Sequence, residues 1–95
     1  MKIVRTQRAL KGYNDVAQYI ADNFGEKALS DFKKRVKEYT KLLKIMPYLG
    51  AVDEEISTDK FEYRTVTVYR RSIMSYRVEG EIIYIVDFWD VRANR

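Results

Sequence analysis

The sequence contains neither cysteine nor histidine, and each absence removes a class of chemistry. Without cysteine the chain has no disulfide, no thiolate nucleophile and no cysteine-ligated zinc. Without histidine it has no imidazole base and no imidazole metal ligand, which excludes Ser–His and Cys–His nucleophilic catalysis. The acidic connector at Asp53–Glu55 resembles a Mg²⁺ ligand set only in its composition, so we expect a solvated loop there. We expect neither a metal nor a small-molecule cofactor.

Long apolar runs are also missing. The longest uninterrupted run is Ile82–Val86, which is far too short to span a membrane. Met1 is followed at once by the pattern of a strand rather than by the apolar stretch of a signal peptide. We therefore expect a cytoplasmic protein that does not act at a membrane.

The remaining composition is that of a folded protein. The 95 residues are 46% hydrophobic and include eight tyrosines and four phenylalanines, which predicts a single domain over residues 1–95. The net charge of +4 is unevenly divided: residues 1–50 carry 11 basic and five acidic side chains, whereas residues 51–95 carry seven and nine. Six of the seven basic residues in the second half are arginines, which bind phosphates and carboxylates in a bidentate manner.

Two helices are predicted in the first half of the chain, after a short strand at Lys2–Thr6. Apolar residues follow a helical period from Asn14 onward, with Asn14 or Gly12 as the N-cap and Gly25 as the C-terminal stop. Since only a few residues around Gly25 separate the helices, they should form an antiparallel hairpin. The second helix ends before Pro47, and its apolar stripe comprises Leu29, Phe32, Val36, Tyr39, Leu43 and Met46.

The second half of the chain changes to a period of two, which indicates three strands: Phe61–Tyr69, Ser72–Val78 and Ile82–Trp89. Arg70-Arg71 and Glu79-Gly80 are the expected turns between them. The last strand is apolar on both faces, which is typical of a central strand. Together the elements predict an α+β fold of order β-α-α-β-β-β, with an antiparallel sheet and the N-terminal helical hairpin packed on one face.

Several short segments carry a recognisable pattern. The most specific part is Tyr76-Arg77-Val78, a short turn and Ile82–Ile85, followed by Asp90-x-Arg92. Other matching segments are Asp15–Ile20, Met46–Gly50 and Glu62–Thr65. In their order and spacing these segments resemble the RelE/ParE superfamily of toxins from bacterial type II toxin–antitoxin modules, also known as plasmid stabilisation proteins. The fold of that family is the β-α-α-β-β-β arrangement predicted above from periodicity.

The resemblance implies a small toxin that a cognate antitoxin binds and neutralises. ParE-like members inhibit growth by acting on DNA gyrase, whereas RelE-like members cleave mRNA on the ribosome. We favour a ParE-like binding inhibitor. The alternatives are a RelE-like ribosome-dependent endonuclease that uses an arginine cluster, and a repurposed, non-toxic member that only binds its antitoxin. RNA cleavage through the 2′-OH requires cations and a proton acceptor but no metal, so the absence of histidine leaves the nuclease alternative open.

The resemblance also implies which residues a nuclease would use. Arg64 falls where RelE-like nucleases carry the first of two sheet lysines, the second falls on Val66, and Arg92 matches a late arginine. Val66 has no proton chemistry, which favours a binding inhibitor or a repurposed member over a nuclease. The candidate catalytic residues are therefore Arg64, Arg77 and Arg92, and the candidates for binding the target or a phosphate are Arg70, Arg71, Trp89 and Asp90.

Each candidate also has a structural interpretation. Arg92 and Asp90 would form an ion pair that fixes the end of the last strand, and Arg70-Arg71 would be a charged turn. The other arginines would be solvated strand residues. Trp89 would pack in the core of a central strand. The lysines of the second helix would form its solvated face; they are Lys33, Lys34, Lys37, Lys41 and Lys44.

Overall fold

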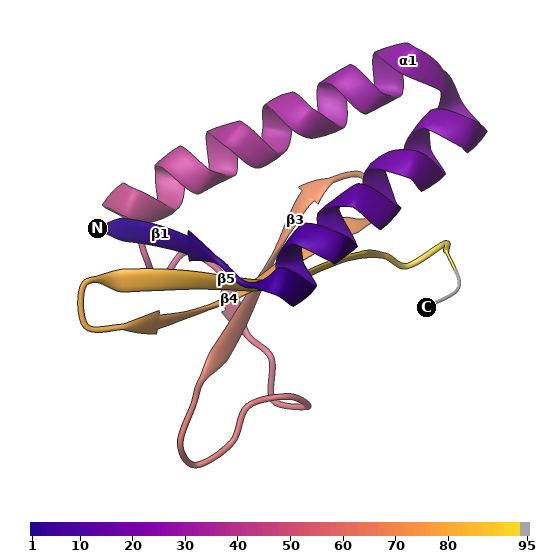
Figure 1. Cartoon of the computed structure of the whole chain (residues 1–95). Coiled ribbons are helices and arrows are strands. Elements are labelled where there is room, and N and C mark those ends of the chain that lie inside the picture. Colours follow the sequence, from indigo (N-terminus) through magenta and orange to yellow (C-terminus); the bar gives the residue numbers. More distant parts are fainter. Residues whose placement is uncertain (94–95) are drawn as a thin grey trace.

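The computed structural model describes residues 1–93, in which one broken helix lies across one face of a sheet (Figure 1). The protein has an α+β fold, as predicted. No helix in this part of the chain is long and apolar enough to cross a membrane. In chain order the elements are β1 (Lys2–Arg5), α1 (Gln7–Ile45), β2 (Ala51–Val52), β3 (Tyr63–Tyr69), β4 (Ser72–Glu79) and β5 (Ile82–Asp90).

Helix α1 begins at Gln7, well before the predicted start at Asn14. Thr6 is the N-cap, and its hydroxyl oxygen accepts a hydrogen bond from the backbone N–H of Ala9 at 3.1 Å. The predicted caps, Asn14 and Gly12, both lie inside the helix. The prediction placed the start too late because glycine disfavours a helix interior and therefore hid the first two turns.

Glycine at position 12 allows close contact between α1 and the sheet. A Cβ on Gly12 would lie 2.6 Å from the carbonyl oxygen of Phe88 in β5 and 3.0 Å from its backbone nitrogen. The helix and strand backbones therefore approach so closely that no other residue fits here without a shift. The ring of Tyr13, the next residue, packs edge-on against Phe88 with the ring centroids 5.4 Å apart.

The predicted helical hairpin is one helical element that is broken at Gly25. This residue has φ 92° and ψ 179°, and glycine adopts such a positive φ without steric cost. We call the parts before and after Gly25 the first and second arms; Figure 1 shows them, in purple and magenta, crossing the sheet in different directions. The second arm ends at Ile45, before Pro47, as predicted.

The predicted apolar stripes are buried except at their ends. Phe32, Val36 and Leu43 of the second arm are almost completely buried. Phe24 and Met46, by contrast, are each 49% exposed. Phe24 immediately precedes the break, and Met46 lies beyond the last residue of the helix, so neither position is held against the sheet.

The strands form one mixed sheet in the order β1-β5-β4-β3-β2. Strand β5 lies between β1 and β4, which confirms that it is an interior strand. The prediction of a wholly antiparallel sheet is wrong at one edge, because β1 pairs with β5 in parallel, with Lys2 opposite Ile82. Side-chain alternation indicates a strand but not its direction. The two-residue strand β2, which pairs with β3, has too short a pattern to be predicted.

Some strand boundaries differ from the prediction by one or two residues. Strand β1 ends at Arg5 because the next residue caps the helix, and β3 begins at Tyr63. Strand β4 runs through Glu79, so the turn starts at Gly80, which has φ 58°. The turn at Arg70-Arg71 lies where it was predicted.

The two faces of the sheet have different roles. Tyr63 pairs with Arg77, and Arg64 pairs with Tyr76, so neighbouring residues on each strand point to opposite faces. The face that carries Tyr76 packs against α1, and we call the other one the open face. The core lies between α1 and the first of these faces; its buried side chains are Ala9, Val16, Ile20, Phe32, Val36, Leu43, Val66, Val68, Met74, Tyr76, Ile83, Ile85 and Phe88.

A buried hydrogen bond joins the turn after α1 to the sheet. The backbone N–H of Gly50 donates to the hydroxyl oxygen of Tyr76 at 2.8 Å, and both groups are buried. A Cβ at position 50 would lie 2.8 Å from the carbonyl oxygen of Thr65 and 2.9 Å from the Tyr76 ring and hydroxyl. The contact therefore requires glycine in the turn and tyrosine in the strand.

Tyr76→Phe should lower the free energy of unfolding by about 1–2 kcal/mol, because it leaves the buried Gly50 N–H without an acceptor. Tyr48→Phe is the matched control, since it removes the same atom from a tyrosine that is 62% exposed; there we expect a change below about 0.5 kcal/mol. Urea denaturation of the three proteins measures both effects. Similar effects of the two substitutions would contradict a specific role for the Gly50 contact.

Candidate functional site

The end of β5 carries a buried carboxylate that accepts four hydrogen bonds. Asp90 accepts from the Ser72 hydroxyl at 2.7 Å and from the backbone N–H of Arg92 at 2.9 Å. The Arg92 guanidinium donates two more, from Nε at 2.9 Å and from Nη2 at 2.7 Å. Burial of the Asp90 carboxyl acts to raise its pKa. The hydrogen bonds from Arg92 and Ser72, together with the charge of Arg92, have the larger combined effect, so the pKa lies below its usual range.

The guanidinium of Arg92 also contacts two rings of the first arm. Its central carbon lies 4.4 Å from the ring centroid of Phe24 and 5.9 Å from that of Tyr19. The hydrogen bond to Asp90 raises the pKa of Arg92 above its ordinary value. The ion pair expected between Asp90 and Arg92 is therefore present, and it fastens the chain after β5 to α1. Phe24, which lies outside the core, thus packs against the Arg92 guanidinium.

The turn at Arg70-Arg71 lies at the same end of the sheet as this ion pair. The carbonyl oxygen of Arg71 accepts a hydrogen bond from the backbone N–H of Val91 at 3.0 Å. Arg70 has φ 47°, and its Nε donates to the Tyr69 hydroxyl at 3.1 Å. Both arginine side chains are exposed. The structure thus brings the turn arginines, Asp90 and Arg92 to one end of the sheet.

Trp89 lies on the open face and does not belong to the core, contrary to the structural interpretation. It pairs with Ile73 of the neighbouring strand β4 and is only partly buried. Its neighbours Phe88 and Asp90, which point to the other face, are almost completely buried. The composition of the strand, apolar at nearly every position, concealed this alternation.

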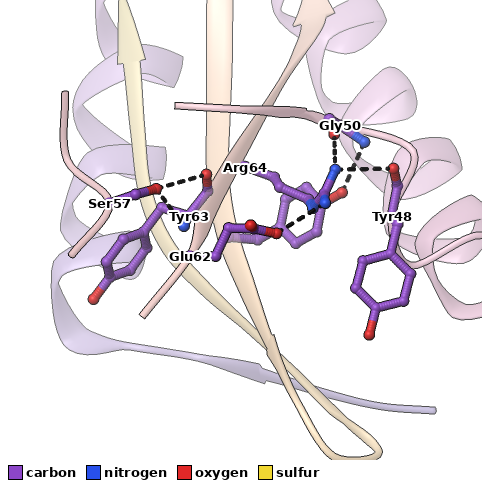
Figure 2. A network of polar contacts seen from close by, with 7 residues as sticks. Tyr48, Gly50, Ser57, Glu62, Tyr63 and Arg64 are labelled. Atoms are coloured by element: carbon purple, nitrogen blue, oxygen red, sulfur yellow. Dashed lines mark hydrogen bonds and ion pairs between the residues drawn. The ribbon is translucent and has the colours of Figure 1, made fainter. Parts of the chain in front are cut away.

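Arg64 holds the turn that follows α1, as Figure 2 shows. Its Nη1 donates to the carbonyl oxygens of Gly50 at 2.8 Å and of Tyr48 at 3.3 Å. Its Nη2 forms an ion pair with Glu62 at 2.8 Å, and the guanidinium lies 5.2 Å from the ring centroid of Tyr48. These contacts occupy the group, and its side chain is only 20% exposed.

Arg77 lies among aromatic rings on the open face. Its guanidinium carbon is 4.5 Å from the ring centroid of Tyr84, 4.7 Å from that of Phe61 and 6.0 Å from that of Tyr63. It also forms an ion pair with Glu79 at 3.2 Å. The cation therefore stacks between side chains of β3, β5 and the connector.

The three candidate catalytic arginines do not share a site. Arg64 points to the helix side of the sheet, and Arg77 points to the open face. Arg77 lies five positions along β4 from Ser72, which pairs with Asp90, and this separates it from the Arg92 end by about 17 Å. A single phosphate group cannot contact all three guanidinium groups in this arrangement.

A basic groove lies between the two arms of α1. Its volume is about 760 Å³, and none of the described residues that line it is acidic. Leu10, Tyr13 and Val36 give it an apolar floor with Thr40. Its cations come from β1 and the second arm; they are Arg5, Lys33, Lys34, Lys37, Lys41 and Lys44. The lysines expected to form a solvated helix face thus line a groove.

Other contacts at these sites could not be found by sequence reasoning. Tyr48 contacts Arg64, and Phe24 contacts Arg92, through the tertiary fold, which no sequence periodicity predicts. Glu62 lies only two residues from Arg64, but the pattern of the strand gave no sign of their ion pair. Arg5 was assigned only to a strand, and its place in the basic groove depends on the path of α1. Within residues 1–93, no group of three or more Asp or Glu side chains is arranged to hold a metal ion.

Asp90→Asn should lower the free energy of unfolding by about 2 kcal/mol at neutral pH, because it weakens the hydrogen bonds from Arg92. The folded-state pKa of Asp90 is lowered, so its contribution is complete above the unfolded value of about 4 and declines as the pH falls below it. The difference between the two proteins should therefore shrink in acid. Denaturation across a pH series measures this, with Asp59→Asn on the exposed connector as the control; a difference that does not vary with pH would contradict the assignment.

The comparisons with known proteins agree with this architecture. The family described as "ParE toxin of type II toxin-antitoxin system, parDE" matches residues 3–94. A solved chain described as "Chromosomal ParDE TA system from P. aeruginosa" has the same fold, with a TM-score of 0.72 over 96% of each chain at 21% sequence identity. No curated protein sequence is significantly similar. Since the family match covers almost the whole chain, this protein belongs to the ParE toxin family of type II toxin–antitoxin systems.

Proposed function

We propose that this protein is the toxin of a two-protein module and that it inhibits growth by binding DNA gyrase, without catalysis of its own. Membership of the ParE toxin family supports the toxin module and implies an antitoxin partner. The observation that carries the choice of a binding mechanism is the separation of Arg64, Arg77 and Arg92. A nuclease without histidine needs several cations around one phosphate, and these arginines lie on different faces and at different ends of the sheet.

The contacts of these arginines support the same choice. Arg64 is held by two backbone carbonyls and Glu62, and Arg92 by all the hydrogen bonds it shares with Asp90. A substrate phosphate would have to replace these partners. These hydrogen bonds and ion pairs therefore stabilise the fold. A binding inhibitor, unlike a nuclease, needs no free cation beside a reacting atom.

The basic groove supports binding of an acidic antitoxin segment. Six cations surround an apolar floor, so a segment with acidic side chains on its edges and apolar side chains along its centre would match both features. Long lysine side chains also place their charges at the rim while their aliphatic parts extend the apolar surface. We propose that the cognate antitoxin neutralises the toxin by docking in this groove.

Expression of the chain in a bacterial host should arrest growth, and the purified protein should inhibit supercoiling by DNA gyrase. Mapping of mRNA 5′ ends in the arrested cells should show no new ends at ribosomal A-site codons. The Arg92→Lys variant is the control for fold, since it retains the cation at the Asp90 site. New A-site ends that disappear in Arg64→Ala would overturn the binding mechanism, and growth without any defect would favour a non-toxic member of the family.

The double substitution Lys37→Glu and Lys41→Glu should weaken binding of the cognate antitoxin by at least about tenfold, because it reverses two charges of the basic groove. Binding of the wild type should also weaken with rising salt concentration. Titration calorimetry at two salt concentrations measures both effects. Lys60→Glu, in the connector outside the groove, is the control, and an equal loss of affinity in that variant would contradict docking in the groove.

A further inference from the structure

The cations of the basic groove have no carboxylate partner. Neither Arg5 nor any of the groove lysines forms an ion pair within residues 1–93, and none of the described residues that line the groove is acidic. Two other lysines of the same helix, Lys11 and Lys27, do pair with aspartates four residues later, at 2.7 Å and 3.2 Å. Unneutralised cations around one concave surface produce a positive potential that attracts a polyanion.

Four of the groove lysines form a row along the second arm. Lys33, Lys37, Lys41 and Lys44 follow one another at intervals of three or four residues, which places them on one face of the helix. We call them the lysine row. Because an α-helix rises 1.5 Å per residue, neighbouring members are about 5–6 Å apart along the axis and the row is about 16 Å long. All four residues are exposed, so the row presents a line of positive charges along the rim of the groove.

The length and chemistry of the lysine row match the phosphate backbone of a nucleic acid. Each strand of duplex DNA carries one phosphate per 3.4 Å of helix axis, so the row spans about five phosphates of one strand. Protein–DNA interfaces are much more positively charged than protein–protein interfaces. Lysine binds a phosphate as a compact point charge and lacks the planar fork with which arginine recognises flat groups. The expected contact is therefore made to the backbone and is independent of base sequence.

The groove offers no free ring on which an unpaired base could stack. Proteins that bind single strands combine a basic groove with aromatic side chains that stack on successive bases. Among the described residues that line this groove, Tyr13 is the only aromatic one. Its ring already packs against Phe32 and Phe88, with centroid distances of 5.5 Å and 5.4 Å. The lysine row therefore suits the outer phosphates of a duplex better than a single strand.

We propose that the lysine row binds the phosphate backbone of duplex DNA without sequence preference. The choice of DNA over duplex RNA rests on the proposed function, because gyrase acts on DNA, whereas the backbone contact itself does not. DNA contacts the rim of the groove, and the apolar floor remains for the antitoxin segment. Lys37 and Lys41 take part in both contacts, so DNA and the antitoxin exclude each other from the toxin.

Fluorescence anisotropy of a labelled DNA duplex, titrated with the purified toxin at several salt concentrations, tests the proposal. If four lysines each neutralise one phosphate, log Kobs should fall against log salt with a slope of about −3.6, so the affinity should drop about 150-fold between 50 and 200 mM salt. Two duplexes of unrelated sequence should bind equally. Tighter binding of the single strand, or a slope near zero, would overturn the backbone contact, and tighter binding of an RNA duplex would overturn the choice of DNA. Binding of poly-glutamate but not of DNA would assign the row to an acidic protein instead.

Two double variants separate the lysine row from the net charge of the protein. Lys37→Gln with Lys41→Gln should make the slope shallower by about 1.8 and weaken the duplex at least about tenfold at 50 mM salt. Lys11→Gln with Lys27→Gln is the matched control, since it removes the same charge from lysines of the same helix that are already ion-paired outside the groove; the slope should change by less than about 0.5. Equal effects of the two variants would overturn the proposal. If the first variant binds DNA like the wild type but loses the antitoxin, the DNA contact is wrong and the antitoxin docking stands.

Discussion

The fold depends on the parallel pairing of the first strand with the last. This pairing places β1 at one edge of the sheet, whereas the next strand along the chain, β2, lies at the other edge. The chain must therefore cross the sheet after β1, and α1 provides the crossing. Gly12 lets its first arm approach β5 at backbone contact distance. The break at Gly25 then returns the second arm over the same face, so that the cations of that arm and Arg5 of β1 line one groove.

The arginines of the second half mainly hold irregular segments in place. Arg64 binds two carbonyls in the turn after α1, Arg92 fastens the chain after β5 to Phe24, and Arg77 stacks among rings near the connector. A guanidinium is suited to this role because its planar group can donate to several acceptors and stack on a ring at the same time. The lysines that line the basic groove, each with a single compact charge, lie on the second arm of α1.

Local pattern was sufficient to predict the elements and their order, and the second arm shows why. The spacing of Phe32, Val36 and Leu43 depends only on the helical period, and all three are buried. The start of α1, the direction of β1 and the partners of Arg64 depend on contacts between residues far apart in the sequence. The same holds for the basic groove, which combines Arg5 and Leu10 with lysines of the second arm. No periodicity encodes such contacts.

A β-bulge interrupts the pairing of β4 with β5. The register between β4 and β5 shifts between Ser75 and Tyr76, so that Val86 has no partner in β4. Ser75 and Tyr76 point to opposite faces because side chains alternate along β4. The extra residue in β5 shifts the alternation of that strand, so that both Ile85 and Phe88 lie in the core. The carbonyl oxygen of Val86 accepts a hydrogen bond from the Thr6 hydroxyl at 3.3 Å, and the same hydroxyl caps α1. The extra residue that keeps Ile85 and Phe88 in the core is therefore also hydrogen-bonded to the residue that begins the helix.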